Sequence, residues 1–478
     1  MKRLRALPVL AALAAACAPL ASKESDRQTG AEMSQEVKTK IGLYPARSQD
    51  WVAEVGKRLV AHLPPEDQTD WDFSFDIVDQ LEPNAFALPG GPIYVTRGLL
   101  ALVVDEDDLA GVLGHEISHV TERHSARQEQ RAILPGILTL PGRLLGVVSP
   151  GLGAVVAAPF AIAGEITLAR YSRSQEADAD RLGVELAARS GYDPRALARI
   201  LERLEKDATR LTGKEHRPSF FDDHPDTPTR VSDVDKESSE VASLKAPPLK
   251  SSPSVVATLD GLVWGSNPAQ GVFHGPLFLH PDLGIALRFP AGWQTMNGAS
   301  AAGAVREREA VVILSVAGSH ADPEAEGKEL SRKLRREDLV PDEERAVVVN
   351  GNPGYYLHVV DGKTDVSVLW VEIGSLTYVT LGLGARTDRP AITASMFSMR
   401  RITEDERKSI DVVRIHPAQS LGGERFAELG KRTGNVWTPD YTAMANGLPE
   451  GAVLGEGAIV KIARRELYVT PPGSASGP

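Results

Sequence analysis

The chain has 478 residues, of which 42% are hydrophobic and 24% are charged, as is typical of a folded protein of two to four domains. This composition excludes collagen-like, fully disordered and polytopic membrane proteins. The formal net charge of −11 argues against nucleic acid as the main partner, because phosphate binding needs a basic surface. The single cysteine excludes a disulfide framework and any zinc finger built on cysteine ligands.

The N-terminus has the pattern of an export signal. Three basic residues precede an apolar run at 7–16, which is too short to span a membrane. Cys17 follows directly, and this arrangement resembles the acylation site of bacterial lipoproteins. We therefore predict an export signal at 1–16, lipidation of Cys17 and a small, polar tether at 17–35. Ordinary signal cleavage with an incidental Cys17 is the alternative.

Helical periodicity dominates residues 36–232. Apolar residues recur at three- and four-residue spacing in 51–63 and 106–130, which predicts two helices. Between them we expect two short strands, at 72–78 and 92–96.

An apolar stretch at 133–168 contains four prolines, so a straight spanning helix is not expected there. We predict broken helices that pack in the core. Contact of this stretch with a membrane surface is the alternative.

A charged and then Ser/Pro-rich segment at 233–256 predicts a linker. Beyond it the period changes to two, which predicts a separate α+β domain at 257–405, of unknown role. Its hairpin turn is expected at Asp361-Gly362. The predicted elements are strands at 283–289, 310–316, 355–360, 366–373 and 376–383, and helices at 324–336 and 390–400.

A last small unit is expected at 411–470. Its strand, helix, Asn446-Gly447-Leu448 turn and closing strand resemble a degenerate LysM-like unit. The usual Gly-Asp-Thr turn is absent, because residues 417–420 read Pro-Ala-Gln-Ser. Peptidoglycan binding and a small module without a ligand therefore both stay open.

The strongest chemical signal is His115-Glu116-Ile117-Ser118-His119. On a helix, the two histidines lie one turn apart on the same face, where both imidazoles can reach one metal ion. Glu116 cannot join them as a ligand, but it can reach a metal-bound water. An apolar stripe along this segment and a capping Asp105 favour the helix.

A second pair of residues can complete such a site. Glu176 and Asp180 stand one turn apart on a predicted helix that opens at Ser172. A catalytic zinc needs a third protein ligand, which Glu176 can supply. Asp180 can accept the outer N–H of a ligand histidine. A solvated acidic helix face is the alternative for both carboxylates.

These motifs, HEISH and SRSQEADAD, together with NAFALPGG at 84–91 and HPDTPTR at 224–230, closely resemble the M48 family of zinc metallopeptidases. The exported bacterial branch, which includes outer-membrane quality-control proteases, is the most similar. The resemblance covers 36–232 and implies a mainly α, zincin-type (gluzincin) domain with a small sheet, within a multidomain chain. It implies zinc as the cofactor, and it assigns roles to residues of both motifs: metal ligands His115, His119 and Glu176, catalytic carboxylate Glu116, and supporting carboxylate Asp180.

The resemblance also places His224 and Arg230 near the metal. His224 would either stabilise the oxyanion of the transition state or act as a reversible extra ligand. A loop histidine and a structural arginine are the alternatives. His124 is expected on the same helix as the HEISH motif, five positions past His119, and therefore pointing away from the site.

We accordingly expect a zinc-dependent endopeptidase of the bacterial cell envelope, on the periplasmic face and anchored in the outer membrane by its lipid. Its expected substrates are unfolded or misassembled polypeptides, which would pair with an edge strand in 84–96. The rival interpretation is a peptidoglycan- or complex-binding lipoprotein whose protease domain is an inert scaffold.

Overall fold

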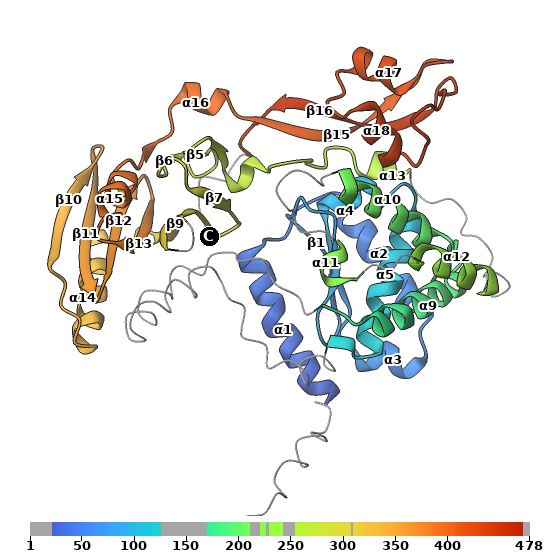
Figure 1. Ribbon diagram of the computed structural model, residues 1–478, viewed down its shortest axis with the longest axis horizontal. Coiled ribbons are helices and arrows are strands. Elements are labelled where there is room, and N and C mark those ends of the chain that lie inside the picture. Colours follow the sequence, from blue (N-terminus) through green and yellow to red (C-terminus); the bar gives the residue numbers. More distant parts are fainter. Residues whose placement is uncertain are drawn as a thin grey trace, which may run out of the picture.

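The computed structural model describes residues 22–125, 170–210, 220–225, 229–241, 254–306 and 309–471. In these ranges the chain forms a helical N-terminal half, a β-rich middle domain and a small C-terminal unit that lies back against the N-terminal half (Figure 1). None of the helices in the described ranges has both the length and the apolar character that a membrane crossing requires. Cys17 and the apolar stretch at 133–168 lie outside the described residues.

A three-stranded sheet in the order β1-β3-β2 forms the frame of the N-terminal half. β1 (Ser74–Val78) runs parallel to β3 (Pro92–Thr96), whereas β2 (Ala85–Ala87) lies antiparallel to β3 at the edge. Successive side chains of a strand point to opposite faces. Val95 accordingly joins the core of the helices, while Tyr94 packs in a separate cluster beneath the first helix. Both strands predicted for this half are present.

Helices cover one face of this sheet and surround α5, which carries the HEISH motif. α5 packs against the edge strand β2 on one side and against neighbouring helices on the others. α5 begins at the predicted residue 106, but it ends at residue 121 instead of 130. The helices of this layer are α2 (Gln49–Val60), α4 (Arg97–Leu102), α5 (Glu106–Thr121), α9 (Arg173–Arg189) and α10 (Ala196–Arg210).

The predicted polar tether is wrong from residue 23 onward, because α1 (Lys23–Lys40) is a helix that packs on the other face of the sheet. Gly30 permits a close approach, since a Cβ there would lie 1.7 Å from the carbonyl oxygen of Pro89. The hydroxyls of Ser34 and Tyr94 are 2.7 Å apart and form a buried hydrogen bond. Small residues thus let a mostly polar helix dock closely on the sheet.

The predicted linker also begins too early. α12 (Arg230–Val241) extends the helical layer to residue 241 and packs on α9 and α10. Its buried Ser238 donates a hydrogen bond to the carbonyl oxygen of Pro194, at 2.8 Å. The charged residues that suggested a linker lie mainly on the outer side of this helix.

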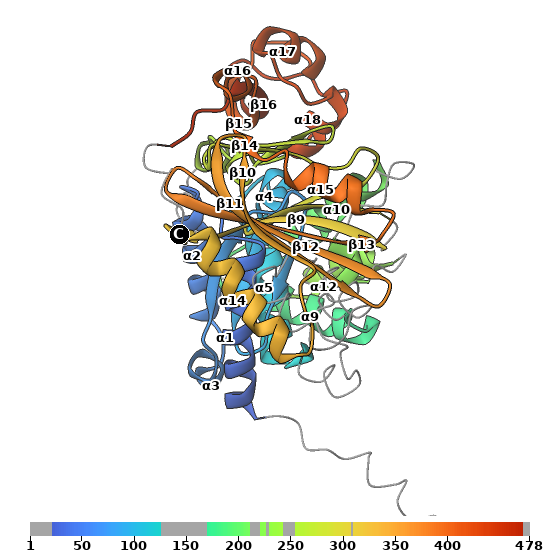
Figure 2. The ribbon, with the colours of Figure 1, turned by 90° about the vertical axis from the view of Figure 1, so that its left-hand side faces the viewer.

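The middle domain contains a seven-stranded antiparallel sheet in the order β10-β11-β12-β13-β9-β8-β7. α14 (Pro323–Arg336) packs on one face, and α15 (Arg389–Met396) with a small four-stranded sheet covers the other (Figure 2). The predicted mixture of strands and helices is present, and a hairpin forms one residue later than predicted, with Gly362 and Lys363 as its turn between the paired Asp361 and Thr364. The large sheet comprises β7 (Gln294–Asn297), β8 (Ala301–Arg306), β9 (Ala310–Ser319), β10 (Glu343–Val349), β11 (Asn352–Asp361), β12 (Thr364–Ile373) and β13 (Leu376–Ala385), and the small one β4 (Val272–His274), β5 (Leu277–His280), β6 (Ile285–Arg288) and β14 (Arg400–Arg401).

The C-terminal unit has the order strand, helix, helix, strand. Its two strands pair antiparallel along their whole length. α16 (Glu404–Lys408) precedes it, and α13 (Val255–Thr258) packs against its sheet. The elements of the unit are β15 (Asp411–Gln419), α17 (Phe426–Thr433), α18 (Pro439–Ala445) and β16 (Ile459–Leu467).

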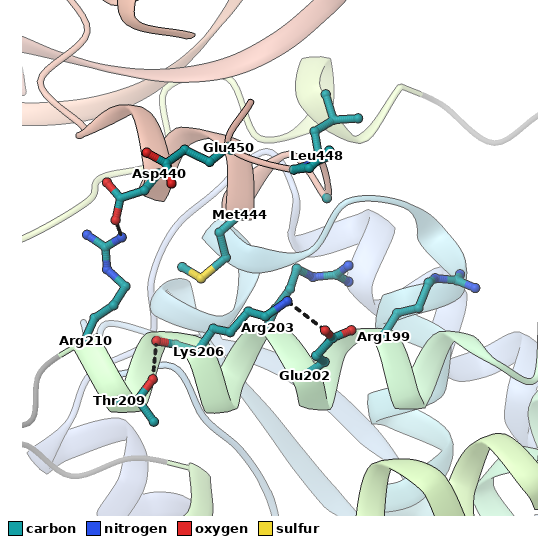
Figure 3. Close-up of a pocket in the computed structure, with 13 residues that line it drawn as sticks. Arg199, Glu202, Arg203, Lys206, Thr209, Arg210, Asp440, Met444, Leu448 and Glu450 are labelled. Atoms are coloured by element: carbon teal, nitrogen blue, oxygen red, sulfur yellow. Dashed lines mark hydrogen bonds and ion pairs between the residues drawn. The ribbon is translucent and has the colours of Figure 1, made fainter. Parts of the chain in front are cut away.

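This unit docks on the N-terminal half through α18 and β16. Arg210 at the end of α10 points across to Asp440 of α18, with which it forms an ion pair, above a groove of about 620 Å³ (Figure 3). Deeper in the contact, the buried Lys461 donates hydrogen bonds to the carbonyl oxygens of Ala101 (2.9 Å) and Val103 (2.5 Å). Lys461 thereby satisfies carbonyls at the end of α4 that have no partner within a helix.

Burial lowers the pKa of Lys461 to about 7, and the nearby Arg203 adds to this effect. The unfolded chain, with an ordinary lysine pKa, binds more protons than the folded one from about pH 7 to about pH 10. The free energy of unfolding is therefore expected to rise with pH across this window. Below it, Lys461 is protonated in both the folded and the unfolded chain and adds no pH dependence. Lys461→Met should remove this part of the slope, measured by urea unfolding at a series of pH values. Lys431→Met, at an exposed position of α17, is the matched control and should keep the slope; equal slopes for all three proteins would contradict the assignment.

Candidate metal centre

α5 holds His115 and His119 on one face, because a capping box defines the first residue of the helix and its inner face is apolar. The Asp105 side chain accepts from the backbone N–H of Asp108 at 2.9 Å, and the Asp108 carboxylate accepts from Asp105 in return, forming a capping box. The two histidine Nε2 atoms lie 3.0 Å apart, and both rings are fully buried. The helix and the shared face predicted from the sequence are therefore present.

α9 brings Glu176 to the histidines. Its first turn is closed by a capping box of Ser172 and Gln175, which places Glu176 at the buried start of the helix. Glu176 Oε1 lies 3.4 Å from His119 Nε2, and Oε2 lies 3.7 Å from His115 Nε2. The carboxylate thus faces the inner nitrogens of both imidazoles.

Two glycines set the distance between these helices. A Cβ at Gly183 of α9 would lie 2.7 Å from the backbone nitrogen of His115, and a Cβ at Gly114 of α5 would lie 2.9 Å from the carbonyl oxygen of Gly183. Any larger residue at either position would push the helices apart. The close contact is what allows a short glutamate side chain on α9 to reach histidines on α5.

His224 follows the short helix α11 (Phe220–Asp223) and enters the same cluster. Its Nδ1 lies 3.1 Å from Glu176 Oε1 and 3.3 Å from His115 Nε2. The ring stacks on Phe220, with centroids 4.3 Å apart and planes 6° from parallel. Burial opposes protonation of His224, but the carboxylates of Glu176 and Glu116 outweigh it and raise its pKa to about 9.

Asp180 and Arg230 support the cluster from behind. Asp180 Oδ1 lies 2.9 Å from His115 Nδ1, the nitrogen that faces away from the cluster. Arg230 is bidentate to Asp180, with two distances of 2.9 Å, and its Nη1 lies 2.9 Å from Glu176 Oε2. Burial alone would raise the pKa of the Asp180 carboxyl, but the Arg230 guanidinium holds it below its usual range. The arginine therefore keeps Asp180 ionised, while the neighbouring His224, His119 and His115 lower the pKa of Glu176.

Glu116 lies beside the cluster and is the least supported polar group in it. Neither carboxylate oxygen has a hydrogen-bond partner among the described residues, and the side chain is fully buried. Burial raises the pKa of Glu116 despite the opposing effect of His224, whose Nε2 is 3.6 Å away. A carboxyl with a raised pKa that lacks a fixed partner is suited to exchanging a proton with a reacting group.

His124 was expected to point away, and that expectation is wrong. α5 ends at Thr121, and Arg123 adopts a left-handed backbone conformation with φ 53°. The chain therefore turns back, and His124 Nδ1 lies 2.9 Å from His119 Nδ1. Tyr171, which no sequence motif indicated, stacks on the His119 ring with the two centroids 3.8 Å apart.

The residues present fit a metal ion. His115, His119, Glu176 and His224 each offer one ligand atom, and these atoms lie within 4.8 Å of one another in a fully buried pocket of side chains. Without a cation, three imidazole nitrogens and a carboxylate would face each other with too few protons to satisfy them all. Histidine nitrogen and carboxylate oxygen are ligands typical of a catalytic zinc.

Comparison with known proteins is consistent with this geometry. Residues 46–238 match the model of peptidase family M48. The beta-barrel assembly-enhancing proteases of Yersinia pestis and Escherichia coli strain K12 are each 32% identical, over 196 and 188 residues, or 40% and 38% of this chain. The mitochondrial metalloendopeptidase OMA1 of Schizosaccharomyces pombe is 28% identical over 194 residues, or 39% of this chain and 52% of its own length.

The likeness to these relatives is partial. The matched part of the chain spans 39% of the length of the Yersinia protein and 37% of the Escherichia protein. Among solved structures, a cyanobacterial PsbP from Synechocystis is matched over 29% of this chain and 98% of its own, at 16% identity and a TM-score of 0.22.

The cluster predicts different consequences for its two glutamates. Glu176→Gln should weaken zinc binding by roughly 100-fold or more, because it removes the carboxylate that faces both histidines. Glu116→Gln should retain the metal, because Glu116 is not among the four residues that converge. The metal content of each protein after dialysis against a graded chelator series measures this difference. Stoichiometric zinc in Glu176→Gln at moderate chelator concentration would contradict the assignment.

Proposed function

Because residues 46–238 match the model of peptidase family M48, we propose that the protein is a zinc-dependent endopeptidase of the bacterial cell envelope, which cleaves unfolded or misassembled polypeptides. The observation that carries this proposal is the convergence of His115, His119, Glu176 and His224 beside the carboxylate of Glu116, which has no hydrogen-bond partner among the described residues. A merely structural metal site would not need such a carboxylate.

The proposed chemistry divides between the metal and Glu116. A zinc ion held by the two histidines and Glu176 would polarise a water molecule and the scissile carbonyl. Glu116 accepts the proton of the attacking water and returns it to the leaving amine, and its raised pKa suits both steps. Asp180 and Arg230 keep His115 and Glu176 in place while charge develops on the substrate.

Substrate binding is proposed along β2. This strand pairs with β3 on one side only, and no other described strand pairs with its outer edge. β2 packs against α5, so an extended peptide added to this edge would pass close to the metal cluster. Pairing with a strand edge recognises backbone groups, which supports a preference for unfolded chains over a specific sequence.

The location in the envelope rests on the sequence. The export signal and the lipid anchor at Cys17 predict an outer-membrane lipoprotein that faces the periplasm. The order strand, helix, helix, strand of the C-terminal unit is compatible with the LysM-like resemblance, so a peptidoglycan contact is retained as part of the proposal. The rival function, a binding lipoprotein with an inert protease scaffold, would leave the buried Glu116 without a role.

Digestion of casein by the full chain tests the proposed activity. We expect cleavage that a chelator abolishes and that added zinc restores. Glu116→Gln should lower turnover by about 10²–10⁴, because the proton acceptor is lost while the metal stays bound. Zinc-loaded protein that cleaves no unfolded substrate, or an unimpaired Glu116→Gln variant, would favour the inert scaffold.

His224 allows a sharper test because its two roles predict opposite results. The position of Nδ1, within 3.3 Å of both Glu176 and His115, supports the role of a reversible extra ligand. His224→Ala should then open a coordination position and raise basal proteolysis of an unfolded substrate. If His224 instead donates to the oxyanion, the same change should lower kcat by roughly 10²–10³. Unchanged steady-state kinetics would remove His224 from the site.

A further inference from the structure

We propose that His124 is a positioning residue that accepts a hydrogen bond from the outer nitrogen of His119 and thereby orients the second metal ligand. The inference rests on the proposed function, because it treats His119 as a zinc ligand. Its basis is the 2.9 Å distance between His124 Nδ1 and His119 Nδ1, on the side of the His119 ring that faces away from the cluster.

The turn after α5 is built to deliver His124 to this place. The backbone N–H of Glu122 closes the helix on the carbonyl oxygen of Ser118, at 3.0 Å. Arg123 then takes up its left-handed conformation, while its Nε forms an ion pair with Asp26 of α1 at 2.6 Å. Because this ion pair is largely buried, it fixes the turn and with it the direction of the next residue.

A second contact holds the backbone of His124. The side-chain amide of Gln175 donates to the backbone carbonyl oxygen of His124 at 3.1 Å. Gln175 also completes the capping box of α9, one residue before Glu176. The backbone of His124 is thereby tied to the helix that supplies the carboxylate, and its fully buried ring is held against His119.

The proton positions follow from the geometry. The Nε2 of His119 faces the cluster, so a metal bound there leaves the proton on Nδ1. For this N–H to be accepted, His124 must present a lone pair at Nδ1 and carry its own proton on Nε2. The two imidazole ligands are then supported differently: His115 by the charged Asp180, and His119 by a neutral imidazole.

Tyr171 restrains the same ring by another means. It stacks on His119 with centroids 3.8 Å apart and planes 18° from parallel, and its hydroxyl lies 3.0 Å from the Ser125 hydroxyl. Stacking restricts tilting of the His119 ring but leaves rotation within its plane. The hydrogen bond to His124 supplies that missing restraint, which is why the two contacts are not equivalent.

The test compares three variants of the full chain by zinc affinity, measured in competition with a chromogenic chelator. His124→Phe keeps a ring but removes the acceptor, and it should weaken zinc binding by roughly 10–100-fold. His124→Asn retains an acceptor oxygen near the position of Nδ1 and should recover most of the affinity. Tyr171→Phe keeps the stacked ring, loses only the hydroxyl and should bind zinc as the parent does.

Two further measurements separate positioning from folding. The thermal unfolding of the apoproteins should be similar for His124→Phe and His124→Asn, and the visible absorption of the cobalt-substituted form should change only in His124→Phe. Equal zinc affinity in the parent and in His124→Phe, or equal losses in both His124 variants, would overturn the acceptor role. A parent chain that binds no zinc at all would instead overturn the proposed function.

Discussion

The close contact between α5 and α9 is the constraint on which the rest of the site depends. It exists because neither Gly114 nor Gly183 carries a side chain, so that the backbones meet. With the helices at this distance, residues on α9 can reach His115 from two directions: Glu176 on the inner side of the ring and Asp180 on the outer side. A separation larger by the width of one methyl group would remove both contacts together.

The cluster also buries several negative charges, which need compensation. Three acidic side chains, Glu116, Glu176 and Asp180, are almost completely removed from solvent. Arg230 compensates two of them directly, and a bound cation would compensate the remainder. His224 and Arg230 come from a part of the chain separate from α5 and α9. Binding of a cation at the site is therefore coupled to the placement of this segment, because both contribute to balancing the buried charge.

Pairs of site residues that lie one turn apart on the same helix could be predicted from the sequence. The spacing of His115 and His119, and of Glu176 and Asp180, places each pair on one face whatever surrounds it. His124 could not be predicted in this way, because the end of α5 depends on a left-handed residue and on Asp26, 97 positions earlier in the chain. Nothing in the local sequence around residue 123 signals that partner.

The fold, like the site, was predictable in some elements and not in others. The strands of the middle domain were predictable because β-branched, aromatic and other apolar residues are concentrated in short runs along them, as in β12 and β13. α1 was mistaken for a tether because residues 23–35 are mostly polar and meet the sheet partly through the small residues Gly30 and Ser34, while the buried Val37 lies beyond the predicted end of the tether. The polar composition therefore indicated an exposed segment, whereas the helix packs closely on the sheet.

The C-terminal unit packs against the N-terminal half, and this contact changes where the domain boundaries lie. Segments near 255–264 and 410–468 share one hydrophobic core with the helical half, and Arg97 donates to the carbonyl oxygen of Val263 at 3.0 Å. The middle domain is thus an insertion into a single folding unit, entered and left through neighbouring parts of that unit. A boundary drawn along the sequence after residue 241 would cut through this core, and the helical half alone would expose apolar surface that residues 410–468 cover.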